Sequence, residues 1–142
     1  MANELLLDTG AFVALVDRSE RRHADCVAVL DGWSGRIVTT EAVLTETVLT
    51  ETLYLVGPRW PAQKICLEFL LRGAFLLVPP SLASLKRVSN LMEKYRSVPM
   101  DYADATLVAL GEELGTDRVF TLDHRGFSVY RLNQRKTFRL FP

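Results

Sequence analysis

The sequence predicts an α/β fold of three layers, with helices on both faces of a mainly parallel sheet of four to five strands. Short apolar runs alternate with longer segments of helical spacing along the chain, as expected when helical crossovers join parallel strands. Residues 4–8 (ELLLD) are apolar at three successive positions, which is typical of a strand buried on both faces. With 142 residues and no linker or low-complexity tract, the chain is expected to form one domain over residues 1–142.

In the first half of the chain, glycine and proline mark the ends of the expected elements. Gly32 ends the second helix, the Gly57-Pro58 pair ends a long helix, and Gly73 ends the next one. The long helix contains no glycine or proline, and its apolar residues favour a buried helix over a loop. The expected elements are a strand at 4–8, helices at 11–17 and 23–33, a strand at 36–40, and helices at 41–56 and 61–72.

The second half continues the same alternation. Residues 74–78 (AFLLV) form an expected strand before two prolines, and Ser81 is the expected cap of a helix at 81–95. A helix at 100–114 ends at Gly115, and a strand at 118–122 ends just before Asp123. Residues 127–130 and 137–141 are expected to add edge strands.

Composition excludes several classes of protein. No apolar run approaches the roughly 20 residues that a membrane-spanning helix needs, and the N-terminus is too short and too acidic for a signal peptide. We therefore expect a cytoplasmic protein. Cys26 and Cys66 have no second cysteine or histidine at ligand spacing, so they favour buried thiols over a zinc site.

Charge is distributed unevenly although the net charge is zero. Residues 1–56 hold nine acids against four bases, whereas residues 57–142 hold eight acids against thirteen bases. No acid follows Asp123, but Arg125, Arg131, Arg135 and Lys136 do. These bases are candidates for contacts with phosphates, or they form an ordinary solvated surface.

Acidic residues stand at the ends of the expected elements. Asp8 ends the first strand, Asp123 follows the fourth, and Asp101 and Asp104 share one face of a helix start. Glu46 lies early in the helix after the second strand. Each acid also has a simpler interpretation as a helix cap, a first-turn acid or a turn residue. In a parallel sheet, however, all of them would meet beyond the carboxyl ends of the strands, where ligands bind.

Crowded carboxylates repel one another, and a divalent cation offsets that repulsion. Oxygen ligands select hard ions, so Mg²⁺, or Mn²⁺ in its place, is expected. One such ion, or two about 3.5–4 Å apart, could activate water and stabilise the leaving oxygen during phosphodiester cleavage. The sequence contains no glycine-rich phosphate loop and no pattern for nucleophilic catalysis that would compete with metal-assisted hydrolysis.

Four segments resemble, in order, the motifs of PIN domains. They are residues 6–15 (LLDTGAFVAL), 38–46 (VTTEAVLTE), 100–110 (MDYADATLVAL) and 119–123 (VFTLD). The resemblance implies that Asp8, Glu46, Asp104 and Asp123 are the catalytic, metal-binding residues. It also implies that Thr9 and Thr121 orient these ligands and that Asp101 is an additional acid near the metal.

The resemblance implies a Mg²⁺-dependent endoribonuclease with a PIN-like fold. A chain of this size, without appended domains, is similar to VapC-type toxins of type II toxin–antitoxin pairs. It is accordingly expected to bind a small antitoxin and to form a homodimer. His124 and Arg125, which follow the last acid, are expected to contact the RNA substrate.

A duplication makes the second motif ambiguous. VLTET at 43–47 is repeated at once at 48–52, so either Glu46 or Glu51 could be the ligand. Five residues turn a helix by about 140°, so the two side chains cannot occupy the same place. We favour Glu46, because the preceding strand fixes where the helix starts.

Four other classes of protein share parts of this pattern. A response-regulator receiver needs an acidic pair after its first strand, and a phosphatase of the haloacid-dehalogenase kind needs Asp-x-Asp, where this chain has Gly10. A structure-specific DNA nuclease would share the metal chemistry. A degenerate PIN-like module that binds RNA or protein without catalysis would have no need of all four acids.

Overall fold

The computed structural model describes residues 3–54 and 60–142, with the side chains of 51–54 left out of the description. Five parallel strands form the main sheet in the order β3-β2-β1-β4-β7. Their bounds are β1 (Leu5–Leu7), β2 (Ile37–Thr40), β3 (Leu76–Val78), β4 (Arg118–Phe120) and β7 (Arg139–Phe141). A short antiparallel hairpin of β5 (Arg131–Leu132) and β6 (Lys136–Thr137) lies outside that sheet.

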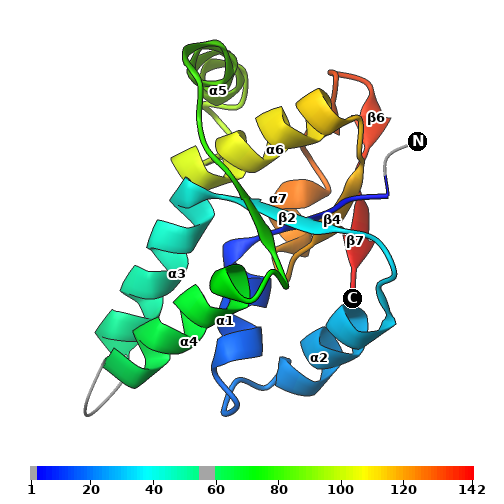
Figure 1. Ribbon diagram of the computed structural model, residues 1–142. Helices are drawn as coiled ribbons and strands as arrows, with labels where there is room; N and C mark the ends of the chain where they lie inside the picture. The colour runs from blue at the N-terminus through cyan, green and yellow to red at the C-terminus, as the bar shows by residue number, and fades with distance from the viewer. Residues whose placement is uncertain (1–2, 55–59) are drawn as a thin grey trace.

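Helices cover both faces of the sheet, which confirms the expected three-layer α/β/α fold. Figure 1 shows α5 and α6 on one side, and α1, α2 and α4 on the other. The helices are α1 (Thr9–Val16), α2 (His23–Gly32), α3 (Glu41–Tyr54), α4 (Trp60–Leu71), α5 (Leu82–Lys94), α6 (Tyr102–Leu114) and α7 (His124–Phe127). Within the described residues, no helix is long and apolar enough to cross a membrane.

The central strand explains why the sheet is parallel and buried. Leu5, Leu6 and Leu7 of β1 have no exposed surface, because helices cover both faces and β2 and β4 flank the strand. Helix α6 packs closely on β1 through Gly111, where an added Cβ would lie 3.0 Å from Leu6 Cδ1 and from the Thr116 carbonyl oxygen. That close approach fixes the C-terminal part of α6 against the middle of β1.

The chain order places a switch point beside β1. The chain passes from β1 to β2 on one side, whereas β4 and β7 lie on the other. In such sheets the space beyond the carboxyl ends of the strands is the usual ligand site. Asp8 follows β1 directly and Thr121 follows β4, so both lie at this edge.

Two expectations about local structure are corrected here. Residues 127–130 do not form an edge strand: α7 and a turn occupy this segment, because the Asp123 side chain accepts a hydrogen bond from the Gly126 N–H and folds the chain into a helical turn. The first helix begins at Thr9, two residues earlier than expected. The expected edge strand at 137–141 is confirmed in β7, and residues 55–56 of the expected long helix lie outside the described residues.

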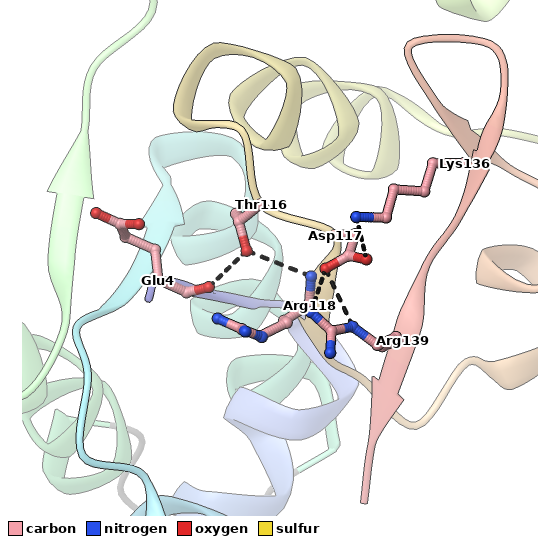
Figure 2. Close-up of polar contacts among 6 residues, drawn as sticks. All are labelled: Glu4, Thr116, Asp117, Arg118, Lys136 and Arg139. Carbon is pink, nitrogen blue, oxygen red and sulfur yellow. Dashed lines mark hydrogen bonds and ion pairs between the residues drawn. The ribbon is translucent and has the colours of Figure 1, made fainter. Parts of the chain in front are cut away.

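Polar contacts, drawn in Figure 2, hold the amino ends of the strands together. Asp117 is 4% exposed and accepts from Arg139 Nη2 at 2.9 Å, and Lys136 Nζ lies 3.0 Å from its other oxygen. The Thr116 hydroxyl donates to the Glu4 carbonyl oxygen at 2.7 Å. These contacts join the beginnings of β1, β4, β6 and β7, far from the acids that follow the strands.

Replacing Asp117 with alanine is expected to lower the free energy of unfolding by about 1–3 kcal/mol, since the change removes a buried acceptor of several bonds. Burial alone would raise the pKa of Asp117, but the bonds from Arg139 and Lys136 outweigh it and lower the pKa. Its stabilising effect is therefore present above the unfolded pKa and is lost as pH falls through the folded pKa. Urea unfolding at pH 7 measures the loss, with exposed Asp31→Ala as the control; equal unfolding midpoints for the two variants would contradict this prediction.

Candidate active site

The acids predicted to form the site line one pocket at the carboxyl ends of the strands. Its volume is about 470 Å³. The residues that line it are Asp8, Thr9, Gly10, Val13, Glu20, Glu46, Thr50, Pro99, Asp101, Asp104, Leu122 and Asp123. Side chains from distant parts of the chain thus converge here, and the set contains six carboxylates but no lysine, arginine or histidine. None of the described side chains that line the pocket carries a positive charge.

Asp8 is the most buried acid of the pocket, at 5% exposure. The Thr121 hydroxyl donates to Asp8 Oδ2 at 2.7 Å and accepts from the Asp123 N–H at 2.9 Å, so one threonine connects the ends of β1 and β4. Burial raises the pKa of Asp8 to about 6, with the charges of Asp123 and Glu46 adding to the effect and the Thr121 bond opposing it. Although Asp8 stands at the N-cap position of α1, its side chain makes no capping hydrogen bond.

Asp104 lies in the first turn of α6 and is half-buried. The hydroxyl of Tyr130 donates to Asp104 Oδ2 at 2.9 Å. Burial, together with the charges of Asp101 and Asp8, raises the pKa of Asp104 to about 7. Asp104 is therefore not the solvated first-turn acid of the simpler interpretation, because its carboxylate is half-buried and lies close to other acids.

Asp101 and Asp123 are exposed, and each also caps a helix. Asp101 Oδ1 accepts from the Asp104 N–H at 2.8 Å, and Asp123 Oδ1 accepts from the Gly126 N–H at 3.0 Å. The interpretation of Asp123 as a turn residue is therefore correct, and Asp101 is the N-cap of α6. Neither cap uses Oδ2, so each carboxylate keeps one oxygen for a ligand. A Cβ at Gly126 would lie 2.5 Å from Asp123 Oδ2, which explains glycine at this position.

Glu46 is half-buried on α3 and faces the same pocket. Burial raises its pKa, as does the charge of Asp101, while the Thr9 hydroxyl lowers it. That hydroxyl is buried and meets no partner with full hydrogen-bond geometry. The duplicated segment is helical, with the Thr47 and Thr50 hydroxyls donating to backbone carbonyls one turn earlier. The Glu51 side chain lies outside the described residues.

The basic residues expected to contact phosphates do not line the acidic pocket. His124 and Arg125 are exposed on α7 but do not line the pocket. Arg131 Nη1 donates to the carbonyl oxygens of residues 128–130, and Lys136 pairs with Asp117 at the opposite edge of the sheet. Arg131 and Lys136 thus have partners within the fold, and their contact with phosphates stays a prediction.

Sequence reasoning missed three residues at the site. Tyr130 was assigned to a strand, and no local pattern links it to Asp104, which is 26 positions away. Glu20, in the loop between α1 and α2, lines the pocket without belonging to any periodic segment. Gly126 belongs to the expected His-Arg-Gly turn, but no sequence pattern indicates its close contact with the Asp123 side chain.

The donor set fits a hard divalent cation. The side chains of the pocket offer carboxylate and hydroxyl oxygens, three of its acids have raised pKa values, and none of the described lining residues is a base. Among the described residues, no three acidic, histidine or cysteine side chains form a preassembled group that could hold an ion. Binding would therefore require rotation of side chains that already share the pocket.

The fold and the acidic pocket together define a known class: the chain belongs to the PIN domain family, whose family model matches residues 5–132. The sarcin–ricin loop cleaving toxin VapC20 of Mycobacterium tuberculosis has a similar structure, with a TM-score of 0.78, 15% identity, and coverage of 86% of this chain and 92% of that one. A toxin–antitoxin complex from Klebsiella pneumoniae gives a TM-score of 0.66 at 17% identity, covering 88% and 91%. At these identities the likeness concerns the fold. A search of curated proteins found no match.

Proposed function

We propose that this chain is a Mg²⁺-dependent endoribonuclease that hydrolyses RNA phosphodiester bonds, as the toxin of a type II toxin–antitoxin pair. The observation that carries the proposal is the pocket of six carboxylates without a base, at the switch point of a PIN-family sheet. A crowded cluster of like charges is unfavourable unless a cation joins it. The PIN fold shared with a toxin that cleaves the sarcin–ricin loop supports the choice of RNA.

In this proposal Asp8, Glu46, Asp104 and Asp123 hold Mg²⁺, or Mn²⁺ in its place. When bound, the ion supplies an activated water and offsets the charge that develops on the phosphate. The chain's own residues position the ligands. Thr121 holds Oδ2 of Asp8 and the backbone N–H of Asp123, and Asp101 accepts from the Asp104 N–H in the first turn of α6.

The residues around the acidic pocket indicate where RNA and a partner protein would bind. His124 and Arg125 begin α7 directly after Asp123, so we propose that they contact RNA phosphates beside the site. A second, mainly apolar pocket of about 480 Å³ shares Glu46 and Asp101 with the acidic one, and we propose a small antitoxin there. The toxin–antitoxin complex of the same fold supports this choice. We also propose that the chain forms a homodimer and acts in the cytoplasm.

Incubation of the purified protein with total RNA tests the proposal. With Mg²⁺ we expect cuts at discrete positions, mapped by sequencing the new 5′ ends, and with EDTA we expect none. Cutting that persists in EDTA would contradict metal-dependent catalysis. Cleavage of branched DNA in preference to RNA would instead favour a structure-specific DNA nuclease, and RNA binding without cleavage would favour a non-catalytic module.

Comparing Glu46→Gln with Glu51→Gln tests which copy of the duplicated segment supplies the ligand. We expect Glu46→Gln to lower cleavage by at least about 100-fold, because it removes a charge from the pocket, and Glu51→Gln to retain activity. Initial rates of cleavage at saturating Mg²⁺ measure both effects. The reverse order of activities would assign the role to Glu51.

A further inference from the structure

Tyr130 contacts an acid of the pocket, although it belongs neither to the sequence motifs nor to the proposed ligand set. It follows α7, is 1% exposed, and donates from its hydroxyl to Asp104 Oδ2 at 2.9 Å. Its side chain therefore reaches the acidic pocket from the interior of the protein, on the side away from solvent.

The ring of Tyr130 has little freedom to move. It packs edge-to-face against Tyr95 and Phe127, with centroids 5.3 and 5.2 Å away. The backbone on either side is also held, because Arg131 donates its N–H to the Tyr95 hydroxyl at 3.0 Å and its guanidinium to the carbonyl oxygen of Tyr130. The hydroxyl is thus presented to Asp104 from a fixed position.

The contact determines how Asp104 can act. A carboxylate has two oxygens, and Tyr130 occupies Oδ2, so Oδ1 is the oxygen that remains available to a ligand. The contact also limits rotation of the carboxylate, which would otherwise turn freely at the end of its side chain. The same phenol lies beside the turn that holds Asp123, since a Cβ at Gly126 would approach the Tyr130 hydroxyl to 3.3 Å.

From this geometry we propose that Tyr130 is a positioning residue, which holds Asp104 in the orientation that binds the divalent cation. This inference rests on the proposed function. It assigns Tyr130 no contact with RNA or with the ion. Its role is to orient a ligand in advance, and the loss of such outer contacts typically weakens metal affinity about 10- to 100-fold.

The test compares Tyr130→Phe with Tyr95→Phe. Each variant removes one hydroxyl from the same aromatic stack and one hydrogen bond, but Tyr95 bonds to the Arg131 backbone and touches no acid of the pocket. Titration of the purified proteins with Mn²⁺, followed by the EPR signal of the free ion, measures affinity without RNA. We expect Tyr130→Phe to weaken Mn²⁺ binding about 10- to 100-fold. Tyr95→Phe loses only a bond that holds the backbone after Tyr130, so we expect it to weaken Mn²⁺ binding by a clearly smaller factor.

Cleavage assays give a second readout. For Tyr130→Phe the Mg²⁺ concentration at half-maximal rate should rise by the same factor, with a smaller change in the rate at saturation. Mn²⁺ binding by Tyr130→Phe equal to wild type, or an equal loss in Tyr95→Phe, would overturn the role of Tyr130. Tight Mn²⁺ binding by the wild type without any RNA cleavage would overturn the proposed function alone, and absence of Mn²⁺ binding by the wild type would overturn both.

Discussion

Asp8→Asn is expected to abolish RNA cleavage, with a loss on the order of 10³-fold or more, as when an essential group of a hydrolase is removed. Asp8 is the acid placed deepest in the pocket, and its charge is the one that the surrounding protein solvates least. Asparagine keeps the size of the side chain and an oxygen that can accept from the Thr121 hydroxyl. The substitution therefore removes the charge while it preserves the packing between β1 and β4.

The measurement is the initial rate of cleavage of a mapped RNA site at saturating Mg²⁺. Asp31→Asn is the matched control, since Asp31 is an exposed acid of α2 and does not line the pocket. Circular dichroism spectra that superimpose for the three proteins would exclude misfolding as the cause. If Asp8→Asn cleaves at even a tenth of the wild-type rate, the pocket is not the site of chemistry.

The architecture was predictable because burial leaves a direct trace in sequence. The three leucines of β1 and the apolar run of β4 show no alternation, and only strands covered on both faces permit that pattern. The convergence of Asp8, Asp104 and Asp123 followed from topology alone, since parallel strands align their carboxyl ends. Their chemical roles remain predictions.

The residues between Asp123 and Tyr130 could not be predicted by the same reasoning. A side chain that caps a turn competes with strand formation, and whether Asp123 accepts from the Gly126 N–H depends on a single local geometry. The hydrogen bond from Tyr130 to Asp104 is a tertiary contact across 26 residues without a periodic signal. Arg131 illustrates the same point, because composition could not show that its guanidinium donates to backbone carbonyl oxygens.

The pocket should also make stability depend on pH and Mg²⁺ in a particular direction. The folded pKa values of Asp8 and Asp104, about 6 and about 7, lie above the value near 4 expected in the unfolded chain. An acid with a raised folded pKa binds protons more tightly in the folded state, so its contribution is full below pH 4 and is lost as pH rises through 6 to 7. For buried Asp8 the loss corresponds to about 3 kcal/mol, and Asp104 adds to it in the same direction.

Thermal unfolding in EDTA should accordingly show a melting temperature that falls between pH 5 and pH 8. Mg²⁺ competes with protons for the same carboxylates, so its stabilising effect should be small at pH 5 and large at pH 8, on the order of 10 °C at 100 times the dissociation constant. Asp104→Asn should melt higher than wild type in EDTA at pH 8 and should lose most of the response to Mg²⁺. Asp31→Asn should behave as wild type in both respects. A Mg²⁺ response of equal size at pH 5 and pH 8 would mean that the ion binds away from these acids.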